Sequence, residues 1–158
     1  MSDFLVLEQQ LVEHLAGQVE FQGRPVDVKS GRQVPRDNAT AEPILRVPAL
    51  LVTYDGYRVL EAAKRQVRIG QGYSVTAVLA NLRDGERLGA REDASILLDD
   101  VIGMVHGWVP PYQSGRAFKP LALTDPAYPP QYGVRNAYFP LSFTTERSLT
   151  GAQPGVTS

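Results

Sequence analysis

Hydrophobic and polar residues alternate over one long stretch in the middle of the chain, residues 66–80. The apolar side chains fall on odd-numbered positions, namely Val67, Ile69, Tyr73, Val75, Ala77 and Leu79. Since successive side chains of a strand point to opposite faces, these residues share one face. The even-numbered positions are small and mostly polar, namely Arg68, Gly70, Gly72, Ser74, Thr76, Val78 and Ala80. The pattern predicts a strand with one face for a core and the other for water or for close approach of another surface.

A helical pattern follows in residues 94–109. Its apolar positions recur with a period of about 3.6 residues, and they are Ala94, Leu97, Leu98, Val101, Ile102, Val105, Trp108 and Val109. We expect this helix to run up to Pro110 and Pro111, because proline has no N–H to donate and disfavours a helical residue before it. The odd face of the long strand is the nearest apolar surface on which the stripe can pack.

Weaker signals place the remaining elements. A first helix begins at Ser2 or Asp3, buries a stripe that includes Leu7, Leu11 and Leu15, and ends near Gly17, where a left-handed cap is usual. Further strands are predicted at residues 19–21, 48–54, 118–123 and 135–146. A turn is predicted at residues 55–56. Residues 48–54 are apolar on both faces, which indicates a central strand.

Residues 22–46 show no sustained period and contain several glycines and prolines. A loop of this length in a compact domain is uncommon, and it is usually functional or disordered. One interpretation is a solvent-exposed loop without a partner. The other is a contact arm for another subunit, with Arg32 and Arg36 among its cations.

The element order is helix, strand, strand, helix, strand, strand. This order predicts an α+β domain with a mostly antiparallel sheet of four to five strands and two main helices packed on one face. We expect residues 1–149 to form this single domain and residues 150–158, which are small and polar, to form a flexible tail.

Composition narrows the class of function. The chain has 158 residues, a net charge of −1 and no cysteine, so it offers no basic footprint for specific nucleic-acid binding, no disulfide and no thiolate site. No apolar run approaches the roughly 18 residues of a membrane span. Asp3 and Glu8 lie where a signal peptide carries positive charge, so no secretion signal is predicted.

No residue pattern indicates catalysis or a cofactor. His14 and His106 lack the spacing of a metal site, and the adjacent Asp99 and Asp100 point about 100° apart on a helix, so they cannot act as a dyad. The Gly70-Gln71-Gly72 sequence lies inside a strand, which favours a bulge or a site of close backbone approach over a phosphate loop. These features suit an assembly subunit whose surfaces mostly contact other subunits or proteins.

Several segments together carry a resemblance to a known family. They are residues 47–56 (VPALLVTYDG), 75–83 (VTAVLANLR), 94–101 (ASILLDDV), 108–111 (WVPP) and 138–145 (YFPLSFTT), preceded by an amphipathic helix. In this order the chain resembles the tail terminator (tail-completion) proteins of Mu-like bacteriophages and related phage-derived tails.

The resemblance implies a structural virion protein of the tail or neck, assembled in the bacterial host cytoplasm. It implies a homo-hexameric ring on the head-proximal end of the tail tube, where the ring stops tube polymerisation and joins the tail to the head. The implied partners are the tail tube protein, a head-completion or connector protein and, in contractile tails, the sheath protein. Genome DNA passes through the lumen without specific binding, and no membrane, catalytic residue or cofactor is implied.

Candidate contact residues follow from the polar strand face and from the loops at 22–46 and 81–89. They are Arg68, Gly70, Gly72, Ser74, Thr76, Arg32, Arg36, Arg83, Asp84 and Glu86. Three other interpretations stay open: the terminator or collar of a phage-derived contractile bacteriocin, another neck protein such as a head-completion or adaptor subunit, and a small enzyme or ligand-binding domain with a pocket between sheet and helices.

Overall fold

The computed structural model describes residues 3–31, 46–80, 87–111, 118–133 and 135–151. Its elements, in chain order, are α1 (Asp3–Leu15), β1 (Glu20–Phe21), β2 (Arg24–Pro25), β3 (Asp27–Ser30), β4 (Ala49–Ala62), β5 (Gln66–Ala80), α2 (Arg87–Val105), β6 (Ala122–Thr124), β7 (Gln131–Tyr132) and β8 (Asn136–Thr150). The long alternating strand lies where the sequence predicts it, because fifteen residues of alternation are a strong local signal.

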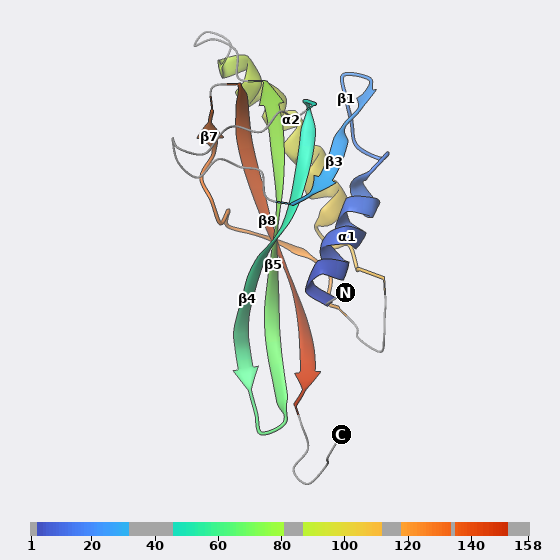
Figure 1. Cartoon of the computed structure of the whole chain (residues 1–158), viewed down its shortest axis with the longest axis vertical. Helices are drawn as coiled ribbons and strands as arrows, with labels where there is room; N and C mark the ends of the chain where they lie inside the picture. Colours follow the sequence, from blue (N-terminus) through green and yellow to red (C-terminus); the bar gives the residue numbers. More distant parts are fainter. Residues whose placement is uncertain (1–2, 32–45, 81–86, 112–117, 134, 152–158) are drawn as a thin grey trace.

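Three long strands form the centre of the main sheet (Figure 1). β5 lies between β4 and β8 and is antiparallel to both. β3 pairs in parallel with the outer side of β4, and β6 and β7 pair antiparallel with β8. The predicted α+β class with a mostly antiparallel sheet is therefore confirmed, with six strands rather than four or five.

The odd-numbered face of β5 carries the main core, as predicted. Tyr73, Val75 and Ala77 are fully buried there. They belong to one apolar cluster with residues of both helices, namely Leu7, Leu11, Leu15, Ala94, Leu97, Val101 and Val105. Burying each large apolar side chain contributes about 1.5–3 kcal/mol before conformational entropy is subtracted. We call this side of the sheet the helix face and the opposite side the far face.

The sheet is longer than the layer of helices that covers it. Figure 1 shows β4, β5 and β8 continuing past the N-terminal end of α1. We call this extension the blade; it consists of residues 56–62 of β4, 66–72 of β5 and 144–150 of β8, joined by the pairings Gly56↔Gly72 and Gly72↔Thr144 at its root. The helix face of the blade is still buried at its root, where Gln71 and Arg147 are 0% and 4% exposed, whereas the tip extends beyond the helices.

The segment 22–46 was predicted to lack regular structure, and this prediction is wrong for its first part. β2 and β3 lie within it, and β3 pairs with residues 49–52 of β4. A strand of four residues is too short to show a period, and its pairing partner lies about twenty residues away, so local sequence does not reveal it. Residues 32–45 lie outside the described residues.

The predicted turn at Asp55 and Gly56 is also wrong, because the strand runs through it. The register shifts between Tyr54 and Gly56, so Asp55 is the extra residue of a β-bulge. Gly56 has a φ of 121°, which a residue without a Cβ adopts at little cost. A glycine that resembles a turn signal therefore serves here to keep a fourteen-residue strand continuous.

The second helix ends earlier than predicted. α2 stops at Val105, and Trp108 and Val109 lie beyond it. Gly107 has a φ of 86°, and its N–H donates to the carbonyl of Leu121 at 2.7 Å rather than to a helical carbonyl. A left-handed glycine at this position ends the helix before Pro110 is reached.

The last two predicted strands are shifted or lengthened. β6 occupies residues 122–124 instead of 118–123. β8 continues past the predicted end at residue 146, and Thr150 still pairs with Gln66. The expected tail therefore begins inside the sheet, and residues 152–158 lie outside the described residues.

Candidate functional site

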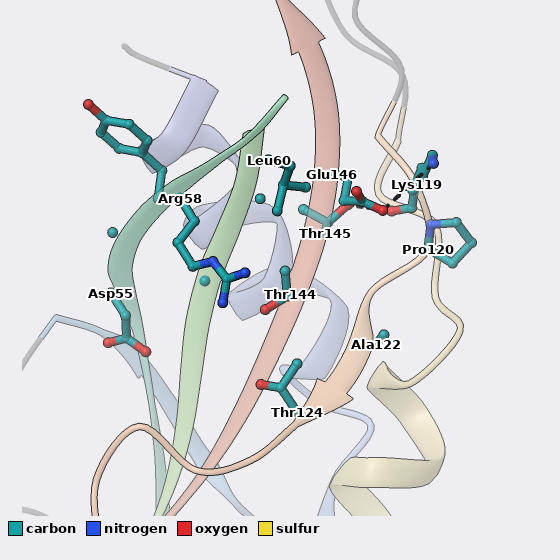
Figure 2. Close-up of a pocket in the computed structure, with 14 residues that line it drawn as sticks. Asp55, Arg58, Leu60, Lys119, Pro120, Ala122, Thr124, Thr144, Thr145 and Glu146 are labelled. Carbon is teal, nitrogen blue, oxygen red and sulfur yellow. Dashed lines mark hydrogen bonds and ion pairs between the residues drawn. The ribbon is translucent and has the colours of Figure 1, made fainter. Parts of the chain in front are cut away.

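A groove of about 660 Å³ lies on the far face of the blade. Its floor and one wall come from β4, β5 and β8, and the other wall comes from residues 119–124. Figure 2 shows the side chains of Arg58 and Thr144 in this groove, with Asp55 and Thr124 near one end and Glu146 and Lys119 near the other. The β4–β5 hairpin, β8 and residues 119–124 thus build one concave surface.

Two glycines of the central strand form the floor of this groove. Gly70 pairs with Arg58 and Glu146, and Gly72 pairs with Gly56 and Thr144. Neither Gly70 nor Gly72 has a positive φ, so the backbone does not require glycine there. The floor is low because three neighbouring positions, including Gly56, carry no side chain.

The chain itself has room for a Cβ at both floor positions. A Cβ on Gly70 would lie 3.5 Å from Thr144 Cγ2, and one on Gly72 would lie 3.7 Å from the carbonyl oxygen of Gly56, both ordinary contact distances. Glycine inside a strand costs about 0.5–1 kcal/mol relative to alanine. Nothing within the described part of the subunit explains this cost, whereas close approach of another backbone or surface would.

Charged side chains form the rim of the groove. Arg68 contacts Glu146 at 2.5 Å and Glu61 at 3.6 Å, and Lys119 contacts Glu146 at 3.6 Å. These pairs are largely solvent-exposed, so each contributes little to folding stability. Arg58 is exposed and has no ion pair within the described residues. The rim is therefore a mixed-charge surface rather than a binding site for one kind of ion.

The root of the blade is held on the helix face by a buried arginine. Arg147 is 4% exposed, and its guanidinium lies 4.7 Å from the ring centre of Phe4 and 5.8 Å from that of Phe118. Its Nε–H donates to Gln71 Oε1, and Gln71 Nε2 in turn donates to the hydroxyl of Tyr73 at 2.8 Å. This network joins β8 and β5 to the first turn of α1.

Tyr73 and Tyr54 share this environment. The Tyr73 hydroxyl donates to the carbonyl of Phe4 at 2.9 Å, and the Tyr54 and Tyr73 rings lie 5.5 Å apart. Burial raises the pKa of Tyr73 well above its usual value, and burial followed by the nearby Tyr57 raises the pKa of Tyr54. Both phenols are therefore neutral at physiological pH, and that of Tyr73 both donates and accepts a hydrogen bond.

The predicted contact residues fall into three groups. Arg68, Gly70 and Gly72 lie on or beside the groove, and their clustering agrees with the sequence pattern. Ser74 and Thr76 lie on the same face but are only 2% and 5% exposed within the single chain, so water does not reach them. Ser74 donates to Asp55 Oδ2. The five others, namely Arg32, Arg36, Arg83, Asp84 and Glu86, lie outside the described residues.

Sequence reasoning missed the other residues of the groove. Arg58, Lys119 and Glu146 come together only through the register of three strands and the chain after α2. The unexplained glycines at 70 and 72 were the one local signal of this surface.

Both histidines have structural partners. His14 Nε2 lies 2.8 Å from the carbonyl of Met104, and its ring stacks on Trp108 at 4.2 Å between ring centres. His106 Nδ1 accepts the N–H of Leu123 at 3.0 Å. His14 thus connects α1 to the end of α2, and His106 connects α2 to β6.

The described residues contain no group of three or more histidine or carboxylate side chains arranged to hold a metal ion. No helix among them is long and apolar enough to cross a membrane.

The chain matches a known protein family along most of its length. Residues 7–153, nearly the whole chain, match a family described as phage tail terminator protein. No curated protein matches the sequence. The family predicted from the sequence segments is therefore confirmed.

Proposed function

The chain belongs to the phage tail terminator protein family, and from this premise we propose that it forms a hexameric ring on the head-proximal end of the tail tube. It is a structural protein of the phage tail, and its family is not one of enzymes. In the proposed role the ring stops tube polymerisation and joins the tail to the head. The match over residues 7–153 is the observation that carries this proposal.

The physical task of a terminator is to end a repeating structure. A tube of identical rings has no intrinsic end, since each added ring recreates the surface that received it. A terminator must bind that surface and present a different one. This subunit has unlike surfaces: helices cover one face of the sheet, whereas the other face carries a glycine-floored groove with a charged rim.

We assign the groove on the far face of the blade to contact with another tail component. Gly70 and Gly72 lower its floor beyond what the described fold requires, and Arg68 lies at its side. The proposed partners of the ring are the tail tube protein, a head-completion or connector protein and, in a contractile tail, the sheath protein. Arg32, Arg36, Arg83, Asp84 and Glu86 remain proposed contacts on the loops, and Ser74 and Thr76 remain proposed contacts beneath the surface.

Genome DNA is proposed to pass through the lumen of the ring. A net charge of −1 suits a channel along which DNA slides, because bound lysines and arginines would retain the phosphates. The particle location that follows is the virion tail, at its junction with the head.

Loss of the protein tests the proposal. Cells producing particles without it are expected to accumulate free heads and unjoined tails, with tube lengths spread beyond the normal value, as seen by electron microscopy of lysates. Tails of normal length joined correctly to heads would contradict the terminator role. Tails of normal length that fail only to join would instead indicate a neck adaptor.

A further inference from the structure

Arg58 is a cation of the groove that has no carboxylate partner within the described part of the chain. It is exposed, and its side chain lies in the groove (Figure 2). The other charged groups that line the groove are engaged: Glu146 contacts both Arg68 and Lys119, and Asp55 accepts a hydrogen bond from a serine hydroxyl. Arg58 is therefore available to a carboxylate from outside the subunit, to which a guanidinium can donate two parallel hydrogen bonds.

Most of the remaining lining of the groove is apolar. Leu60, Pro120 and Ala122 line it together with the floor glycines Gly70 and Gly72. A floor without side chains lets a partner come close, and the apolar walls favour burial of an apolar side chain. The groove therefore suits a convex surface that carries an apolar residue with a carboxylate beside it.

The outer side of α2 is such a surface. The inner side of this helix packs in the main core. Glu92, Ile96 and Asp99 lie on the opposite side, because positions i, i+4 and i+7 share one face of a helix. Ile96 is 58% exposed, and Glu92, Asp99 and the adjacent Asp100 are exposed and have no ion pair within the described residues. We call Glu92, Ile96, Asp99 and Asp100 the acidic stripe.

We propose that the acidic stripe of one copy of this chain occupies the groove of a second copy. Ile96 then lies over the glycine floor, and Asp99 or Asp100 accepts hydrogen bonds from Arg58 of the neighbouring copy. α2 packs on the helix face and the groove opens on the far face, so the two surfaces point in opposite directions. No subunit can place its own helix in its own groove, and the contact therefore joins two copies.

The occupant is a second copy because one chain supplies both halves of a complementary pair, a cation without a partner and carboxylates without partners among the described residues. The contact is heterologous, so each copy can bind two neighbours. A heterologous contact repeated by a rotation that closes makes a ring. The inference therefore rests on the proposed ring, and it identifies the tail component assigned to the groove as the neighbouring subunit.

Because the chain has no cysteine, introduced thiols can be cross-linked selectively. The test variant combines Ile96→Cys on the stripe with Ala122→Cys, at an exposed position of the groove wall. A short bismaleimide should join it into a ladder of chains up to the full ring on a denaturing gel, because each copy carries one thiol in each half of the contact. Ile96→Cys with Arg65→Cys is the control and should form few links, since Arg65 is exposed on the same blade but outside the groove.

Charge reversal gives an independent readout that a loss of folding would not produce. Arg58→Glu should weaken assembly about tenfold or more, because like charges then meet, and Asp99→Arg with Asp100→Arg should do the same. All three substitutions combined should recover most of the assembly, because the attraction returns with its charges exchanged. Arg65→Glu, on the same blade, should leave assembly unchanged. Native mass spectrometry measures assembly, and thermal midpoints show that each variant is folded.

The outcomes separate this inference from the proposed function. Rings of the Ile96→Cys and Ala122→Cys double variant that give no links would overturn the contact between α2 and the groove and leave the ring in place. Failure of the combined charge reversal to recover assembly would also overturn it. Strict monomers of the wild type, alone and with tube protein, would overturn the proposed ring itself.

Discussion

Glu8 Oε2 accepts the amide N–H of Tyr54 at 2.7 Å, which joins helix α1 to the outer edge of β4. β3 leaves this edge just before, where the Gly31 N–H donates to the carbonyl of Val52 at 2.9 Å. The carboxylate therefore supplies the last hydrogen-bond acceptor on the edge before the blade begins. The contact follows directly after Val52, the last residue of β4 that pairs with β3.

Glu8→Ala should destabilise the fold by about 1–2 kcal/mol, because the half-buried N–H of Tyr54 loses its acceptor. Glu13→Ala on the same helix is the control, since Glu13 is exposed and should change the unfolding free energy by no more than about 0.5 kcal/mol. Urea denaturation followed by circular dichroism measures both. Equal stability of the two variants would mean that the contact contributes nothing.

Arg147→Lys should destabilise the fold by about 2 kcal/mol. Lysine keeps the positive charge but lacks the planar group that lies against Phe4 and the Nε–H that binds Gln71. Arg65→Lys, at an exposed position of the β4–β5 turn, should have no measurable effect. The difference between the two thermal midpoints measures how much the buried guanidinium contributes to stability. Equal midpoints would contradict the role assigned to it.

The parts of the fold that the sequence predicts correctly are those with a long local period. Fifteen residues of alternation located β5, and the stripe through Leu7, Leu11 and Leu15 located α1. β3 escaped prediction because its four residues become a strand only through pairing with β4. The bulge at Asp55 escaped because Asp-Gly is also a turn sequence, and only the tertiary pairing decides between the two.

The candidate site, like the fold, could be predicted from the sequence only in part. The floor glycines were identifiable because glycine is unusual inside a strand. The arginine network was not, since its central hydrogen bond joins Arg147 to Gln71, 76 residues apart in sequence. Side chains that meet through strand register have no signature in a local pattern.

Tyr73→Phe should alter how stability depends on pH. The pKa of Tyr73 is raised in the folded protein above its usual value of 10.0 by burial, so the wild type loses stability as pH rises above about 10, where the unfolded chain releases the proton first. At about pH 8 the variant should be less stable by about 1–2 kcal/mol, because the hydrogen bonds to Phe4 and from Gln71 are lost.

This deficit of Tyr73→Phe should shrink as pH rises, because the variant has no phenol to ionise at that position. Denaturation at about pH 8 and about pH 11 gives the two differences, and the other tyrosines cancel between the two proteins. A constant deficit across this range would show that ionisation of Tyr73 is not coupled to folding.

Substitution of the groove glycines should slightly stabilise the isolated subunit but impair its assembly. Gly70→Ala and Gly72→Ala should each stabilise the isolated subunit by about 0.5–1 kcal/mol, because a Cβ finds ordinary contact distances and the unfolded chain loses freedom. Gly70→Val and Gly72→Val should remain folded while raising the groove floor against the partner. Gly103→Ala is the matched control: it lies on α2, has open space around its Cβ, and should also stabilise the subunit.

The decisive measurement is the supply of each variant to cells producing particles without the protein. Gly103→Ala should restore tails of normal length joined to heads, whereas the valine variants should leave long or unjoined tails although they remain folded at the growth temperature. Normal tails from Gly72→Val would mean that no partner approaches the floor of the groove.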